Sequence, residues 1–381
     1  MSDSGKLDTK SIDEDKYREA PFDYLINQKK RYKRSERTIQ QTESSLKFAR
    51  EYFSREEFLS AGPEDIIEYH DWLKKNTSRN ECSRKDLLST LGEVYNLGEG
   101  AGVLSTNPAR VAIRELRESG VLTPSSPSRM RIEMEEMKDF LGFLSTPFER
   151  AVFLTLLKTG VRAGELINID LCCLNLDHVL YRDMLDEYGV ELRDEIQNLP
   201  DSLYIYPAFS GGDVAYGEQR RRGNKRKDPD GTTIPIDEEL KTALIEYILT
   251  RRYTPRDGKP QPLFVKKRVH GDTPRWGYYG LQESLIRCGA VCEYGWWEDG
   301  VSTEEKVTLH YFRHYFSNNH RYGHGVYDGN MHDSVIKYIR GDVGGDDGVL
   351  DNVYTHSGWQ RWSENIKEPY LENVYQFGLY D

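Results

Sequence analysis

Apolar residues recur at the spacing of a helix through the first third of the chain. This pattern predicts one helix over residues 38–53 and a second that follows Pro63, with Glu64 and Asp65 in its first turn. A third helix is expected to begin with Ser83 as its N-cap, and a further one to end before Gly120. This part of the chain is therefore expected to be helical throughout.

Two changes in composition divide the chain into segments. Residues 1–36 show no apolar period and are expected to be a flexible lead-in, whereas residues 37–122 are expected to form a small helical domain. The Pro- and Ser-rich run at residues 123–130 predicts a linker. Residues 131–381 then make a larger second domain, and both domains are long enough to bury a core.

The second domain is expected to be mainly helical with a small sheet. Helices are predicted over residues 133–144, 148–159, 238–250, 280–290, 308–320 and 333–340. Strand-like runs at 203–206 and 232–236 flank a basic stripe and the turn DPDG, which predicts a β-hairpin with a charged tip. The expected fold class is therefore mainly α with a small β-hairpin or sheet, an α+β second domain.

The net charge of −11 and the pI near 5.5 argue against a nucleic-acid partner when taken alone. The basic residues are, however, concentrated in short stripes, of which 220–227 and 251–256 are examples. An acidic chain with local basic stripes favours a DNA-binding protein from a salt-rich cytoplasm, such as that of a haloarchaeon. The alternative for any one stripe is a solvated loop that happens to be basic.

The remaining composition excludes several classes of protein. Five cysteines lie without a CxxC pair, which argues against a disulfide framework and a zinc ribbon. No apolar run of about 18 residues is present, and the N-terminus is acidic where a signal peptide would be basic and then apolar. We therefore expect a cytoplasmic protein with no membrane partner.

Candidate chemistry lies in short motifs of the second domain. The first is TGVRAGELINID at 159–170, in which Arg162 stands between two helices, where an anion could bind or where Arg162 could simply pair with Glu165. The second is HYFRH at 310–314, in which His310 and Arg313 share a helical face. The third, IKYIRGD at 336–342, leads through a Gly- and Asp-rich stretch to LDNVYTHSGW at 350–359.

This ordered set resembles the tyrosine recombinase and phage integrase family, which runs TGxRxxEL, a basic hairpin, HxxR, a short LGH-like helix end and a Tyr in a YTH-like context. The resemblance implies that Arg162 and Arg313 bind the non-bridging oxygens of a scissile phosphate. His310 would transfer or position a proton, the alternative being a buried structural histidine. Tyr354 would be the nucleophile that forms a 3′-phosphotyrosyl intermediate, with no metal, ATP or other cofactor.

The resemblance leaves two positions open. The family's hairpin lysine, expected to protonate the leaving 5′-oxygen, corresponds to Lys227 by its spacing from Pro235, with Lys225 as the alternative. Where relatives commonly have a histidine after the glycine, this chain has Asp342. Asp342 is expected either to orient the pocket as a hydrogen-bond acceptor or to be a plain helix-end residue.

The same resemblance implies the partners. Double-stranded DNA at recombination sites would be held in a two-domain clamp, with residues 37–122 as a core-binding domain of SAM-like type and four protomers on two sites. The tail after Tyr354 would dock on a neighbouring protomer, and an accessory directionality factor is compatible with this class. The basic residues expected to contact DNA phosphates are Arg220, Arg221, Arg222, Arg251 and Arg252. A nucleoid-associated location follows.

Three other functions stay open. A relative that has lost catalysis would bind DNA only, and a type IB topoisomerase would use the same chemistry as a monomer without site choice. The histidines between His310 and His332 could instead serve a metal-dependent nuclease, because His310 and His314 have the i,i+4 spacing of metal ligands. No HExxH motif supports that interpretation.

Overall fold

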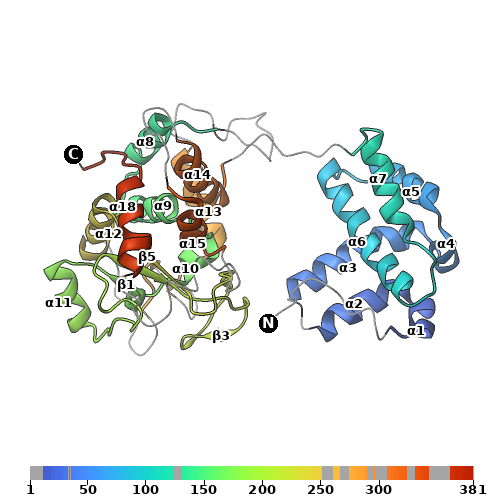
Figure 1. The fold of residues 1–381 in the computed structure, drawn as a ribbon, viewed down its shortest axis with the longest axis horizontal. Coiled ribbons are helices and arrows are strands. Elements are labelled where there is room, and N and C mark those ends of the chain that lie inside the picture. The colour runs from blue at the N-terminus through green and yellow to red at the C-terminus, as the bar shows by residue number, and fades with distance from the viewer. Residues whose placement is uncertain are drawn as a thin grey trace. The chain divides into compact units, whose positions relative to one another are not determined.

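The computed structural model describes residues 12–32, 34, 36–122, 131–250, 261–266, 274–289, 296, 307–323, 331–342 and 361–380. The chain divides into two compact units, Met1–Ser128 and Arg129–Asp381, each with its own apolar core. The expected linker at 123–130 lies outside the described residues, and the division between the units falls within it. Figure 1 draws the helical front unit in blue to cyan and the described part of the larger second unit in green to red.

The front unit is built from helices in the part of the chain that is described. They are α1 (Glu14–Glu19), α2 (Pro21–Arg31), α3 (Glu36–Tyr52), α4 (Arg55–Ser60), α5 (Pro63–Asn76), α6 (Glu81–Gly100) and α7 (Pro108–Glu118). Helix α6 contacts α2, α3, α5 and α7. Its N-cap is Asn80, whose side chain accepts the Ser83 backbone N–H, so the expected capping role of Ser83 is wrong.

The expectation of a flexible lead-in over residues 1–36 is wrong for α1 and α2. Tyr17 and Leu25 are fully buried in the front core, and the Tyr17 hydroxyl donates to the Val94 carbonyl at 3.1 Å. The two helices have only six and eleven residues. Six residues show too few turns for the apolar period of α1 to stand out, whereas Phe22, Leu25 and Ile26 of α2 do have helical spacing, which the sequence interpretation missed.

The second unit is mainly helical, as predicted. Its described helices are α8 (Met134–Gly142), α9 (Pro147–Thr159), α10 (Ala163–Asn168), α11 (Val179–Glu187), α12 (Glu238–Thr250), α13 (Tyr278–Gly289), α14 (Leu309–Tyr322), α15 (Asp333–Arg340) and α18 (Glu368–Asn373), with a 3-10 turn η1 (Leu171–Cys173) and a π-helical turn η2 (Ser363–Lys367). Helix α9 is buried along most of its length, because it lies between α12 and α14 (Figure 1).

A small antiparallel sheet carries the predicted hairpin. Strand β2 (Ser202–Ile205) pairs with β5 (Thr232–Pro235), and β1 (Leu174–Asn175) extends the sheet in the order β1-β2-β5. The pairing of β2 with β5 confirms the hairpin, whereas β1 was not expected. A second, two-stranded pair, β3 (Val214–Ala215) with β4 (Glu218–Gln219), lies in the connection that also holds the basic stripe.

The tail packs on its own unit. Trp362, Tyr370 and Tyr375 are buried there, and the Tyr370 hydroxyl donates to the Lys158 carbonyl at 3.0 Å. The fully buried Lys158 ammonium in turn donates to the Tyr375 carbonyl at 2.6 Å. The described part of the tail, residues 361–380, therefore packs in the core of its own unit, and docking on a neighbouring protomer stays a prediction.

No helix among the described residues combines the length and the apolar character that a membrane span requires.

Candidate active site

The corner between α9 and α10 fixes the position of Arg162. Helix α9 ends at Gly160, whose backbone is left-handed with a φ of 59°, and a Cβ there would lie 2.6 Å from the Phe316 ring. Glycine is required for both reasons. Glu165, in the first turn of α10, accepts the Arg162 backbone N–H and its Nη1, each at 2.9 Å. The expected ion pair between Arg162 and Glu165 is confirmed. It is not a surface ion pair, because Glu165 is fully buried.

Arg313 projects from α14 to the same place and is almost fully buried. Its Nη1 donates to the carbonyls of Gly160 at 2.7 Å and Arg340 at 2.8 Å. Burial and the nearby charge of Arg162 lower the pKa of Arg313 to about 9. The guanidinium is therefore mainly charged at neutral pH, and its planar fork suits several bonds of fixed direction.

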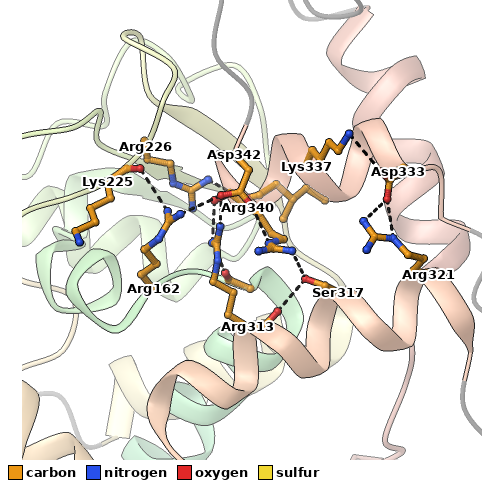
Figure 2. Close-up of polar contacts among 12 residues, drawn as sticks. Arg162, Lys225, Arg226, Arg313, Ser317, Arg321, Asp333, Lys337, Arg340 and Asp342 are labelled. Atoms are coloured by element: carbon orange, nitrogen blue, oxygen red, sulfur yellow. Dashed lines mark hydrogen bonds and ion pairs between the residues drawn. The ribbon is translucent and has the colours of Figure 1, made fainter. Parts of the chain in front are cut away.

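Asp342 is the anion on which the arginines converge. Its Oδ1 accepts Arg162 Nη2 at 2.9 Å and Arg313 Nη2 at 2.6 Å, while Arg340 Nε lies 3.0 Å from Oδ2 (Figure 2). Partial burial opposes ionisation of Asp342, but the charges of Arg313, Arg340 and Arg162 outweigh it and lower the pKa. Asp342 is thus a hydrogen-bond acceptor that joins Arg162 and Arg313.

Arg226 lies beside this cluster of arginines and is fully buried. Its Nη1 donates to the Ile339 carbonyl at 2.6 Å, and its Nη2 lies 3.4 Å from Glu165 Oε2. The side chain passes so close to Gly341 that a Cβ there would lie 2.1 Å from Arg226 Cδ. Gly341 also ends α15 with a left-handed φ of 65°. Only glycine allows the chain to turn over Arg226 and bring Asp342 back to the arginines.

The two candidate lysines flank Arg226 in the sequence and are both exposed. The Lys225 carbonyl accepts Arg162 Nη1 at 3.4 Å, and the Lys227 backbone N–H donates to the Gly341 carbonyl at 3.2 Å. These two contacts join the backbone of Lys225 to Arg162 and the backbone of Lys227 to Gly341. Each lysine therefore stays a candidate for the proton donor.

His310 is exposed on α14, one turn before Arg313. Its ring stands edge-on to that of His314, with centroids 4.7 Å apart. Since its side chain is exposed, His310 is not the buried structural histidine that was the alternative. His320 is that kind of residue, because burial lowers its pKa to about 3 and its ring stacks on Tyr375.

The structure corrects one predicted DNA contact. Arg220 is fully buried, and its guanidinium donates within the core to Asp170 Oδ2 at 2.7 Å and to the Ala215 carbonyl at 3.0 Å, so it is a structural residue of the core. Arg221 is exposed, and the half-buried Arg222 lies over the Tyr278 ring at 4.9 Å. The remaining predicted residues lie outside the described part of the chain: Tyr354, Arg251 and Arg252.

Arg226 and Arg340 were not expected in the site. Arg226 was noted only as one member of the basic stripe, although its place between Lys225 and Lys227 gives a usable signal. If both lysines point outward from an extended segment, the residue between them points inward. Arg340 ends α15 and carries no comparable signal, because its position depends on how α15 packs against α14.

Among the residues that the structure describes, no three His, Cys, Asp or Glu side chains gather as they would around a metal ion. His332 instead caps α15 by accepting the Ser334 backbone N–H.

Comparison with known proteins relates this geometry to solved structures. No protein-family profile and no curated protein matches the sequence. The structure is similar to that of the Tn1549 transposon integrase in complex with transposon right end DNA, with a TM-score of 0.59 and 15% identity over 91% of this chain and 98% of that one. It is also similar to a lambda integrase dimer bound to a COC′ core site, with a TM-score of 0.53 and 14% identity over 85% of this chain and 94% of that one. The chain therefore has the integrase fold that its motif resemblance to the tyrosine recombinases implied.

Proposed function

We propose that this protein is a site-specific DNA recombinase that cuts and rejoins duplex DNA through a 3′-phosphotyrosyl intermediate. The observation that carries the proposal is the convergence of Arg162 and Arg313 on one oxygen, Asp342 Oδ1. Arg162 comes from the corner between α9 and α10 and Arg313 from α14, so the two arginines belong to separate motifs. A pair of planar cations that already binds one anion is suited to the two non-bridging oxygens of a phosphodiester.

Tyr354 is the proposed nucleophile. It follows Asp342 by twelve positions, and an extended chain of that length spans roughly 40 Å, so it can reach the pocket. Attack of the phenolic oxygen on phosphorus forms the tyrosyl–phosphate bond and breaks the bond to the 5′-oxygen. The charge that grows on the phosphoryl oxygens is stabilised by Arg162 and Arg313. The 5′-hydroxyl of another strand then reverses these steps. Because the phosphotyrosyl bond keeps the energy for religation, no ATP is required, and neither step uses a metal.

One of the exposed lysines, Lys225 or Lys227, would protonate the leaving 5′-oxygen, and we propose Lys227 for this role. Replacing each lysine separately by alanine tests the choice. A substrate with sulfur in place of the bridging 5′-oxygen needs no proton donor, because a thiolate is a good leaving group. The variant that loses cleavage of ordinary DNA and recovers it with this substrate identifies the acid; recovery by Lys225→Ala alone would overturn the assignment to Lys227.

His310, exposed one turn before Arg313, is the proposed group that receives or positions the proton of the attacking tyrosine.

Duplex DNA is the proposed partner. The similar Tn1549 integrase was solved with transposon DNA, and a lambda integrase of TM-score 0.52 was solved as a tetramer bound to a Holliday junction. We propose that the front unit serves as the core-binding domain, that the two units close on DNA, and that four protomers act on paired sites. Arg221 and Arg222 would contact phosphates, as would Arg251 and Arg252.

The proposal is tested with nicked suicide substrates from the DNA that the protein recombines, incubated in EDTA and separated on a denaturing gel. The wild type should form a covalent adduct, Tyr354→Phe should not, and Tyr322→Phe, which alters an exposed tyrosine of α14, should behave as the wild type. DNA binding without any adduct would favour a silent relative. Cleavage only with divalent metal would favour the nuclease, and relaxation of supercoiled DNA by a monomer would favour a topoisomerase.

A further inference from the structure

The carboxylate of Asp342 occupies the donors that the proposed function assigns to a phosphate. Arg162 Nη2 and Arg313 Nη2 both donate to Oδ1, at 2.9 and 2.6 Å. Figure 2 shows the two guanidinium groups turned toward this oxygen. A phosphodiester carries one negative charge, as does an ionised aspartate, and it would need the same two donors. Two anions cannot accept from the same N–H groups at the same distance.

Glu165, the other carboxylate beside these arginines, does not accept from the two donors that the phosphate would need. Glu165 is fully buried, and it accepts Arg162 through its backbone N–H and Nη1 while its Oε2 lies near Arg226. Its contacts hold the backbone N–H and Nη1 of Arg162, and Nη2 of Arg162 donates to Asp342. Asp342 is thus the anion that joins the two arginines at the face where a substrate would bind.

Arg340 is a further ion-pair partner for Asp342, one that Asp342 can keep when it leaves the other two arginines. Its Nε lies 3.0 Å from Asp342 Oδ2, the oxygen that the other two arginines do not use. Its Nη1 donates to Ser317 Oγ at 2.7 Å, which in turn donates to the Arg313 carbonyl at 2.9 Å. The Arg340–Asp342 pair is about a quarter exposed, so it can turn outward without burying a charge.

We propose that Asp342 is a built-in substitute for the scissile phosphate: it holds Arg162 and Arg313 in place before DNA binds, and then yields them to the phosphate while Arg340 keeps its carboxylate. This inference rests on the proposed function. It assigns a positioning role to the residue that stands where relatives commonly have a histidine. Asp342 keeps Arg162 and Arg313 in place without DNA, but it lowers the affinity for DNA, because the phosphate must displace its carboxylate.

The test is the affinity of the full chain for a short mixed-sequence duplex, measured by fluorescence anisotropy. Asp342→Asn keeps the shape and removes the charge, so it should bind roughly tenfold more tightly, which corresponds to about 1.4 kcal/mol. Asp333→Asn is the matched control, because it removes one negative charge from α15 that pairs with Arg321 and Lys337 outside the pocket. It should change the affinity far less.

A double-mutant cycle separates displacement from simple repulsion. If the phosphate displaces Asp342 from the arginines, the gain of Asp342→Asn should disappear when Arg162 and Arg313 are both replaced by alanine. A gain that persists in that background, or that molar salt removes, would overturn the proposal, because a screened long-range repulsion would then explain it. Unchanged or weaker binding by Asp342→Asn would overturn it as well.

Sulfate gives a second readout that does not depend on DNA. Folded Asp342→Asn should be stabilised against heat by lower concentrations of sulfate than the wild type requires, and Asp333→Asn should match the wild type. Equal sulfate dependence in all three proteins would contradict the proposal. Failure of the proposed function looks different: the wild type would then form no adduct, and alanine at Arg162 and Arg313 would leave DNA binding unchanged.

Discussion

The charge of Arg313 is buried, and Asp342 is its ion-pair partner. Because the arginines hold the pKa of Asp342 below its usual value of 3.8 in the folded protein, the carboxylate stabilises the fold above that value. The contribution is lost as the pH falls through the lower folded pKa. Asp342→Asn should therefore lower the free energy of unfolding without DNA by about 1–3 kcal/mol near neutral pH, a discounted value for a partly exposed pair.

Urea unfolding of the wild type and Asp342→Asn between pH 7 and pH 3 measures this difference. The gap between the two proteins should stay constant down to about pH 5 and narrow below about pH 4. A gap that widened in acid would contradict the assigned direction of the pKa shift. Asp342→Asn should therefore have a lower free energy of unfolding and, at the same time, a higher affinity for DNA than the wild type.

Arg313 should not tolerate lysine. A lysine keeps the charge but cannot bond at once to the Gly160 and Arg340 carbonyls and to Asp342 with the geometry of a planar fork. Adduct formation by Arg313→Lys should fall by about 100-fold or more, the range found when one preorganised donor to a transition state is removed.

Arg321→Lys is the control for this change, since Arg321 lies on the same helix and pairs with Asp333 at the surface. Its rate of adduct formation should match that of the wild type. If both variants kept the wild-type rate, Arg313 would not be part of the catalytic site.

The ordered motifs predicted that Arg162 and Arg313 belong to one site, and the structure brings both to Asp342, whereas the role of His310 stays a prediction. The sequence could not show that Asp342 would face three arginines, because that contact depends on the left-handed turn at Gly341 and on the packing of α15 against α14. Arg220 shows the opposite error. A charge in a basic stripe appears exposed when only its neighbours in sequence are considered, whereas Asp170 holds it in the core.

The turn that ends α15 gives a prediction for an element. Gly341→Ala would place a methyl group 2.1 Å from Arg226 Cδ and force a residue with a side chain into a φ of 65°. We expect a loss of about 2–4 kcal/mol of stability, as for overpacking combined with backbone strain, and little adduct.

Gly189→Ala separates the two causes, because Gly189 has a φ of 59° with open space around it. It should cost only about 1 kcal/mol, the contribution of the backbone alone. Thermal unfolding measures both variants, and equal losses would show that Arg226 does not press on Gly341.

Long elements were predictable because several helical turns repeat the same apolar spacing. Helix α12, with 13 residues, has the predicted bounds Glu238–Thr250. Short elements were not, since α1 and α4 have six residues each and β1 has two. They are stabilised by the core that they join, so their own sequence carries little of the information.

At the scale of the whole second unit, Lys158 joins distant segments. Its ammonium is fully buried and lies 2.6 Å from Asp237, 2.7 Å from Glu239 and 2.6 Å from the Tyr375 carbonyl of the tail. Lys158→Met would leave two buried carboxylates without their cation. We expect it to lower the free energy of unfolding by about 3–5 kcal/mol.

Lys241→Met is the matched control, because Lys241 pairs with Asp201 and Glu238 nearer the surface. It should cost about 1 kcal/mol or less. Thermal unfolding of the full chain compares the two variants. A Lys158→Met protein as stable as Lys241→Met would show that this cluster does not hold the tail on its own unit.

The most direct test of the central claim is the identity of the amino acid that becomes linked to DNA. The wild-type adduct from a suicide substrate is digested with nuclease and protease, and mass spectrometry locates the nucleotide on the peptides. We expect a 3′-phosphonucleotide on Tyr354 and on none of the other 24 of the chain's 25 tyrosines. A nucleotide on any other residue, or cleavage that leaves no protein–DNA bond, would contradict it.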